Sequence, residues 1–211
     1  MAKTKEYAHL IKPMAIRDAP AGLYGEPRIW MEAKDLEGFD AHFSYGFIQK
    51  PCVCHPLEGS VVHPYDELLV FVAYQSDILQ LGAEIAVELG EEREEHVFDK
   101  PSVILVPKGT PHGPITVRKL DNPIVHYSIG LSPEYTASAL PKKTKTTGSR
   151  HAHLIKRMIT HKDPADTSGF SKVTDERGVM HPAEMGVGPG NGDQIVWLYG
   201  RDLEGMQVNF T

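Results

Sequence analysis

The 211-residue chain has 41% hydrophobic and 24% charged residues, which is typical of soluble globular proteins. Its formal net charge is −6 and it has no long basic run, so neither nucleic acid nor an anionic membrane is an expected partner. No segment approaches the roughly 20 consecutive apolar residues of a membrane helix. No apolar segment follows the first lysines, so we do not expect a signal peptide. Small molecules and other protein chains remain as partners.

The two cysteines indicate a reducing environment. Cys52 and Cys54 are too close in sequence for an unstrained bridge, so we expect free thiols and a cytoplasmic protein. Strand alternation would place both thiols on one face and His55 on the other. Because no second cysteine pair exists to complete a structural zinc site, we interpret both residues as packed or reactive thiols.

The distribution of glycine and proline predicts an all-β protein. Sixteen prolines and 19 glycines separate short apolar runs, and helical periodicity is rare. The expected strands are 41–48, 67–73, 82–89, 102–107, 115–120 and 124–129. Six or more short strands of this kind are typical of a β-sandwich or β-barrel.

Two short motifs occur twice in the chain, in the same order. Ala-His-Leu-Ile-Lys at 8–12 recurs at 152–156, and Asp-Leu-Glu-Gly at 35–38 recurs at 202–205. The second copy therefore repeats only the part that precedes residue 44. Since such a partial unit cannot bury its own apolar face, we expect it to pack on the barrel of its own chain or of a partner subunit, which favours a homodimer.

The repeat divides the chain into four expected parts. Residues 1–40 form a lead-in segment, residues 41–131 form the barrel core, residues 132–150 form a linker or arm, and residues 151–211 form a truncated second copy of the lead-in. The linker is expected because its Ser, Thr, Pro, Lys and Ala residues lack the apolar alternation of the preceding strands.

A candidate metal site combines residues from two strands. In an extended chain His63, Tyr65 and Glu67 project to one side. The turn at 107–111 follows an apolar strand and would bring His112 into the same space. Two histidines and one carboxylate can bind a divalent ion such as Fe, Mn, Zn or Ni and leave coordination positions open for water or substrate.

These residues resemble the two motifs of the cupin superfamily. His63 and Glu67 reproduce the His-x3-Glu of the first motif, and 107–112 reproduces the Pro-x-Gly-x-x-His of the second. The resemblance covers about residues 40 to 130. It implies a cupin-type jelly-roll β-barrel with His63, Glu67 and His112 as metal ligands on the inner wall.

Three positions depart from the cupin pattern. Val61 stands where the first motif has its first histidine, Tyr74 where it has a glycine, and Thr116 where the second motif has an asparagine. The usual set of four ligands is therefore incomplete. His55, Tyr65 or water could supply the fourth ligand, and the sequence does not decide among them.

Further residues are candidates for contact with a substrate. Arg118, Lys108 and His126 could bind an anionic group near the metal, although strand charges usually face water. Tyr65 could transfer a proton if it is not itself a ligand.

Two functions of different kinds are consistent with this site. The first is a metal-dependent enzyme of dioxygenase, isomerase, decarboxylase or lyase type, acting on a carboxylate-bearing or oxygen-rich small molecule. The second is a non-catalytic cupin that serves as a ligand-binding or structural module, which the replacement by Val61 and the truncated repeat would suit.

Overall fold

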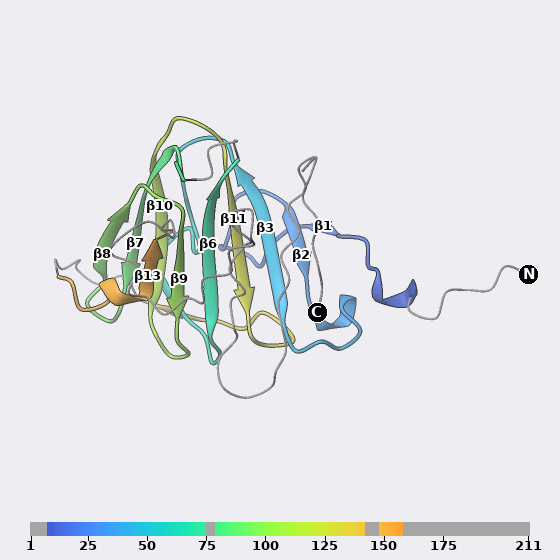
Figure 1. The fold of residues 1–211 in the computed structure, drawn as a ribbon. Coiled ribbons are helices and arrows are strands. Elements are labelled where there is room, and N and C mark those ends of the chain that lie inside the picture. The colour runs from blue at the N-terminus through green and yellow to red at the C-terminus, as the bar shows by residue number, and fades with distance from the viewer. Residues whose placement is uncertain (1–7, 75–78, 142–147, 158–211) are drawn as a thin grey trace, which may run out of the picture. The chain divides into compact units, whose positions relative to one another are not determined.

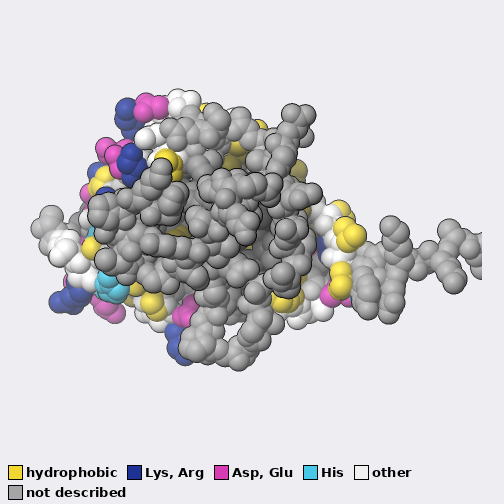
Figure 2. Space-filling view, in the orientation of Figure 1, with side chains coloured by type: hydrophobic (Ala, Val, Ile, Leu, Met, Phe, Trp, Pro, Cys, Tyr) yellow, Lys and Arg dark blue, Asp and Glu magenta, His cyan; other side chains and the backbone are white. Residues whose placement is uncertain are grey.

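The computed structural model describes residues 8–74, 79–141 and 148–157, and all of these belong to the first of two compact units, Met1–Met158. The second unit, Ile159–Thr211, lies outside the described residues. Among the residues described, no helix is long and apolar enough to cross a membrane. Figure 2 shows acidic and basic side chains lying next to each other on the visible surface, in keeping with the mixed charge of the sequence.

The fold consists of two antiparallel sheets (Figure 1). The seven-stranded sheet has the order β1 (Ile16–Arg17), β2 (Arg28–Met31), β3 (His42–Ile48), β11 (Ile124–Gly130), β6 (Glu67–Ala73), β9 (Ser102–Val106) and β13 (Ile155–Arg157). The second sheet has the order β12 (Ser138–Leu140), β5 (Ser60–Val62), β10 (His112–Leu120), β7 (Ala83–Leu89) and β8 (Glu94–Phe98). Strand β4 (Cys52–Cys54) also pairs with β10. Three short 3-10 helices, η1 (Ala8–Leu10), η2 (Ala33–Asp35) and η3 (Ala152–Leu154), complete the described elements.

Alternating side chains from the two sheets form one hydrophobic core. In β9, for example, Ser102, Ile104 and Val106 are buried, whereas the two residues between them are half-buried. Phe71 of β6 contacts Phe98 of β8 edge to face, with ring centroids 5.5 Å apart, so the core connects both sheets. The prediction of an all-β jelly-roll fold is confirmed.

The six predicted strands are present with small shifts of their ends. The largest difference is in β10, which begins at His112 rather than at residue 115. The strands that the sequence did not predict, among them β4, β5 and β12, have two to five residues each. Segments this short carry too little alternation to be recognised from sequence.

The segment predicted as a linker contributes to the barrel in its first part. The strand β12 pairs with β5, and residues 132–136 run alongside the interior histidines, as described below. The sequence favours a linker because this segment is rich in Ser, Thr and Pro. Its main-chain polar groups, rather than an apolar pattern, hold it in place.

The two copies of Ala-His-Leu-Ile-Lys adopt the same local structure in different surroundings. Each begins with a 3-10 helix, η1 in the first copy and η3 in the second. The second copy continues into β13, which pairs with β9 and buries Leu154 to 8% exposure, whereas Leu10 of the first copy is 58% exposed. The start of the second copy therefore packs on the barrel of its own chain. The rest of this predicted copy lies outside the described residues.

This difference predicts unequal effects of the same substitution. Leu154→Ala should lower the free energy of unfolding by about 2–4 kcal/mol, because it removes a buried leucine side chain from the core. Leu10→Ala, the matched control in the other copy, should change it by less than about 0.5 kcal/mol. Urea denaturation of both variants measures the difference. Equal losses would contradict the proposed packing of the second copy.

Candidate metal centre

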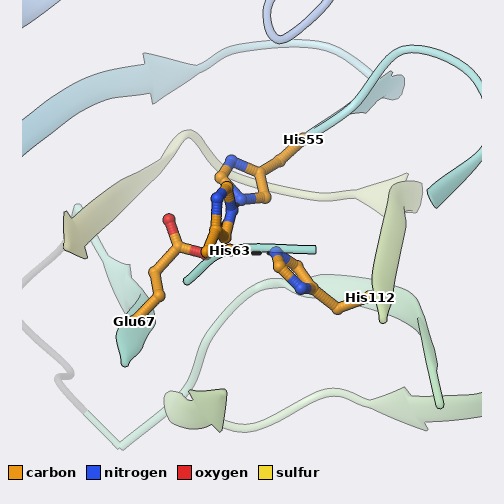
Figure 3. A group of neighbouring side chains, drawn as sticks. All are labelled: His55, His63, Glu67 and His112. Carbon is orange, nitrogen blue, oxygen red and sulfur yellow. Dashed lines mark hydrogen bonds and ion pairs between the residues drawn. The ribbon is translucent and has the colours of Figure 1, made fainter. Parts of the chain in front are cut away.

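Four buried side chains meet inside the barrel (Figure 3). His55 follows β4, His63 follows β5, Glu67 begins β6 and His112 begins β10. Their potential ligand atoms all lie within 4.8 Å of one another. None of the four residues is more than 2% exposed. The structure thus brings together all four residues that the sequence proposed as metal ligands, including His55.

The distances in the cluster suit a divalent ion. The Oε2 atom of Glu67 lies 3.2 Å from the Nε2 atom of His55, 3.4 Å from that of His63 and 3.1 Å from that of His112. Ligands bound at about 2.1 Å are separated by roughly 3.0 Å in octahedral and roughly 3.4 Å in tetrahedral geometry. The three measured separations fall within this range.

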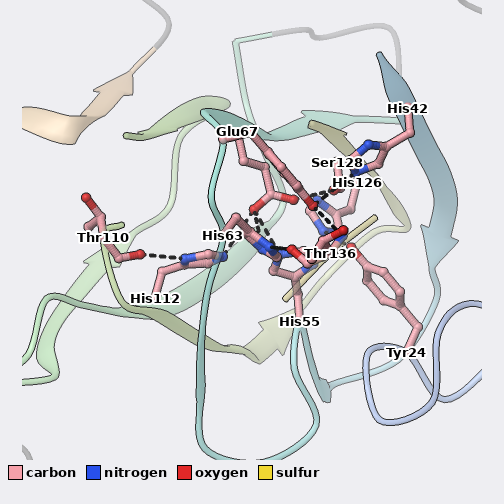
Figure 4. A network of polar contacts seen from close by, with 11 residues as sticks. Tyr24, His42, His55, His63, Glu67, Thr110, His112, His126, Ser128 and Thr136 are labelled. Atoms are coloured by element: carbon pink, nitrogen blue, oxygen red, sulfur yellow. Dashed lines mark hydrogen bonds and ion pairs between the residues drawn. The ribbon is translucent and has the colours of Figure 1, made fainter. Parts of the chain in front are cut away.

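Hydrogen bonds to main-chain carbonyls fix the tautomers of two of the histidines (Figure 4). The Nδ1 atom of His63 lies 2.7 Å from the carbonyl oxygen of Thr136, and that of His112 lies 3.1 Å from the carbonyl oxygen of Thr110. Because a carbonyl can only accept, each Nδ1 carries the hydrogen. In the neutral rings each Nε2 therefore presents a lone pair, and neither Nε2 has a hydrogen-bond partner.

The tautomer of His55 is fixed through two further residues. His126 Nδ1 must donate to the carbonyl oxygen of Val70, 3.2 Å away, so its Nε2 accepts from the hydroxyl of Tyr24 at 3.0 Å. The hydroxyl of Tyr24 in turn accepts from Nδ1 of His55 at 2.9 Å. The Nε2 atom of His55 is left with a lone pair directed at Glu67.

Glu67 is held in the ionised form. Its Oε1 atom accepts a hydrogen bond of 2.7 Å from Ser128, which leaves Oε2 facing the histidines. Burial opposes ionisation of this carboxyl, but positive charge and N–H donation from the facing imidazoles, above all His55, outweigh burial and hold the pKa of Glu67 well below its usual value when no metal ion is bound. With all three imidazoles neutral, a bound cation would have to supply that positive charge.

Three imidazole lone pairs and one carboxylate oxygen consequently converge on one point. With no cation between them these groups would repel one another, so the donor set fits a divalent metal ion. A proton on one of the imidazoles can partly replace the positive charge of such an ion. Burial opposes the charged form of His63, but the carboxylate of Glu67 outweighs burial and raises the pKa of this imidazole.

The main chain places His55 in the position that Val61 cannot fill. Strand alternation alone would direct this side chain away from Cys54, yet both residues are buried. His55 has a positive φ of 46°, which ends the strand and turns its ring inward. Gly113 makes room for it, because a Cβ atom there would lie 2.3 Å from the carbonyl oxygen of His55. Val61 itself pairs with His112 across β5 and β10.

Tyr65, the predicted proton-transfer residue, lies beside the cluster. Its ring stacks on that of His63, with centroids 4.9 Å apart and planes at 13°. The amide of Thr136 donates to its hydroxyl at 3.2 Å, and Nε2 of His42 lies 3.4 Å from the hydroxyl. His42 donates through Nδ1 to the carbonyl oxygen of Ser132, so its Nε2 can accept the phenolic proton. Burial raises the pKa of Tyr65 and keeps the phenol protonated.

The three predicted substrate residues lie apart from the cluster. Arg118 is exposed and forms an ion pair of 2.6 Å with Glu95 on the outer surface. Lys108 is also exposed, and its main-chain amide donates to Asp66. His126 is buried, but both ring nitrogens are used by the hydrogen bonds that orient His55. The structure brings none of these three side chains into the ligand cluster.

Sequence reasoning missed several residues that support the site: Tyr24, His42, Ser128 and Thr136. Ser128 could have been found, because parity along the predicted strand places it on the same face as His126. Tyr24 and Thr136 come from segments without a strand pattern. His42 lies in a strand whose partners the sequence does not reveal.

Comparisons with known proteins give a weak structural similarity. No protein-family model matches the chain, and no curated protein matches its sequence. Among solved structures, the Bacillus subtilis oxalate decarboxylase at pH 4.6 aligns with a TM-score of 0.42 and 11% identity, over 60% of this chain and 30% of that one. An oxalate decarboxylase structure from a study of substrate binding mode and reaction specificity aligns with a TM-score of 0.41, 11% identity and the same coverage.

A third structure, from a study of the Mn(II) centres of the Bacillus subtilis enzyme, has a TM-score of 0.38 and 10% identity, over 52% of this chain and 26% of that one. The chain thus spans less than a third of the length of these enzymes. Similarity of this degree does not determine the reaction or the substrate. The site must be interpreted from its own residues: an all-β barrel with a buried His-His-Glu-His cluster that could bind a metal.

The hydrogen bond from His55 to Tyr24 predicts a role for this tyrosine in metal affinity. Tyr24→Phe removes the acceptor that fixes the His55 tautomer, so metal affinity should fall about 10–100-fold. Competition with a chromophoric chelator measures the dissociation constant. Tyr74→Phe, at an exposed tyrosine, is the matched control and should keep the wild-type value. An unchanged constant in Tyr24→Phe would show that the tautomer of His55 does not depend on this bond.

Proposed function

We propose that the protein is a metal-dependent cupin enzyme that uses one divalent ion to transform a small carboxylate-bearing molecule. The proposed ligands of this ion are His55, His63, Glu67 and His112. The observation that carries this proposal is the convergence of four lone pairs, with two Nε2 atoms that lack any hydrogen-bond partner. Membership of the cupin superfamily is supported by the two sequence motifs and the jelly-roll arrangement of the strands.

The donor set is compatible with Fe, Mn, Zn or Ni. Such an ion, when bound, supplies a Lewis acid or an oxygen-activating centre. The protein side chains provide the rest of the chemistry. The stack on His63 holds the ring of Tyr65 beside the ligands, and His42 Nε2 is the group that can take a proton from the hydroxyl of Tyr65. These two residues form a route for a proton between the metal centre and strand β3.

Elemental analysis by plasma mass spectrometry tests the proposal. Purified protein should contain about one equivalent of a divalent transition metal, as expected for a site with four protein ligands. His112→Ala should lose at least about tenfold in metal affinity, since it removes one of the four. His153→Ala, at an exposed histidine, is the matched control.

The outcomes separate the two kinds of function. Bound metal that is lost in His112→Ala and retained in His153→Ala supports an enzyme site, and the identity of the metal then directs substrate screening. Protein that binds no metal, even after incubation with each of the four ions, would refute the metal site and leave a non-catalytic binding or structural module.

We also propose that the chain forms a homodimer in the cytoplasm. The exposed first copy of the repeat supports this proposal. Leu10 and Ile11 are 58% and 82% exposed, while Leu154 and Ile155 of the identical second copy pack on the core. Exposed apolar side chains in a segment whose twin is packed suggest a partner surface.

The double substitution Leu10→Asp and Ile11→Asp should convert a dimer to a monomer, because it places charges on the surface that would be buried. Light scattering after size-exclusion chromatography measures the mass. Lys50→Asp, at an exposed residue of a surface ion pair, is the control and should leave the mass unchanged. A dimeric double variant would exclude the first copy from the interface.

A further inference from the structure

Arg28 is a buried cation without an ionic partner among the residues that the structure describes. This β2 residue is 7% exposed. Its Nη2 donates to the carbonyl oxygen of His126 at 2.7 Å, and its Cζ lies 3.7 Å from the ring centroid of Tyr24. Its Nε has no hydrogen-bond partner, and Arg28 makes no ion pair with any carboxylate in the described part of the chain.

This is an unfavourable arrangement for a guanidinium group. Removing an ion from water carries a large desolvation penalty unless an opposite charge and further hydrogen bonds compensate for it. The other buried arginine shows how the protein normally meets this cost. Arg93 forms an ion pair with the equally buried Glu88. Within the described ranges Arg28 contacts a carbonyl oxygen and an aromatic face but no compensating anion.

Arg28 lies close to the metal cluster. It covers the ring of Tyr24, whose hydroxyl bonds directly to the ligand His55. Gly46 permits this approach, because a Cβ atom there would lie 3.2 Å from Cβ of Arg28. One aromatic side chain therefore separates the guanidinium group from the first ligand.

A second buried donor lies in the same region. Ser44 is 1% exposed and its hydroxyl has no hydrogen-bond partner. Burial raises the pKa of Tyr24, and both Arg28 and Ser44 are close enough to that ring to act against this effect. A guanidinium with an unused Nε donor and a buried hydroxyl are thus located around Tyr24. These are groups that bind a carboxylate.

The net charge of the site with a bound divalent ion also favours an anionic ligand. Glu67 is the only carboxylate in the ligand cluster. Once a divalent ion is bound, the ligand cluster carries one negative charge against the two positive charges of the ion, and the guanidinium of Arg28 adds a further positive charge beyond the ring of Tyr24. In a medium of low dielectric constant such an excess attracts an anion.

We infer that Arg28, with Ser44, binds an anionic group of the substrate, a carboxylate, inside the barrel. This inference rests on the proposed metal-dependent function and assigns the substrate-binding role to a residue of the lead-in segment. It replaces Arg118, which has the same side chain but is exposed and paired with Glu95 on the surface.

The binding of acetate by metal-loaded protein, measured by isothermal titration calorimetry, tests the inference. Acetate is the probe because it carries a single carboxylate, and acetamide is its uncharged control. Wild-type protein should bind acetate and not acetamide. Arg28→Gln should weaken acetate binding at least about tenfold, as expected for loss of a charge-assisted hydrogen bond. Arg118→Gln should bind acetate as the wild type does.

The failures of the two proposals are distinguishable. Equal acetate affinity in metal-loaded wild type and Arg28→Gln overturns the inference and leaves the metal site intact. If wild-type protein binds no metal, the proposed function fails, and the same titration of metal-free protein then decides the role of Arg28. If Arg28→Gln does not fold, Arg28→Lys replaces it: loss of the guanidinium fork should weaken acetate binding at least about threefold, and unchanged affinity overturns the inference.

Discussion

The carboxylate of Glu67 is the group on which the interior of this barrel depends. It is fully buried, ionised, and approached by three imidazole nitrogens at 3.1–3.4 Å. A buried carboxylate is tolerated only where opposite charge and hydrogen bonds compensate it. Ser128 supplies one hydrogen bond, and the three fixed tautomers exclude the imidazoles from supplying others while they are neutral. The remaining compensation must come from a proton on an imidazole or from a bound cation, and the cluster could hold a metal ion.

Two of the three fixed tautomers, those of His55 and His63, link this small site to distant parts of the chain. Thr110 belongs to the turn before β10, Thr136 to the segment after β11, and Tyr24 to the lead-in before β2, yet each fixes one histidine. Each of these contacts involves a group that lies outside the strand that carries the ligand. The geometry of the metal centre is therefore a property of the folded barrel as a whole, because the groups that orient the ligands come from several separate segments.

The sequence predicted the parts of the site that depend on strand periodicity and failed where the backbone departs from it. His63, Glu67 and His112 were identifiable because alternation and one turn place them on the inner wall. His55 could only be one option among three, since alternation directs it outward and the positive φ that turns it inward leaves no sequence pattern. The sequence did not single out Arg28, because strand charges usually face water and only the tertiary structure reveals that Arg28 is buried and Arg118 exposed.

Val61 stands where the first cupin motif has a histidine, and the proposed fourth ligand, His55, comes from a different segment. A fourth ligand must lie at the right place in the barrel interior, but it need not come from one particular position in the sequence. Val61 lies in β5 and pairs with His112 of β10. Strand β4 pairs with the same strand β10, and His55, which follows β4, lies in the cluster. Tyr24 orients His55, and Arg28 covers the ring of this tyrosine. His55 thus connects the candidate metal centre to Tyr24 and Arg28, so residues before the barrel core support the site.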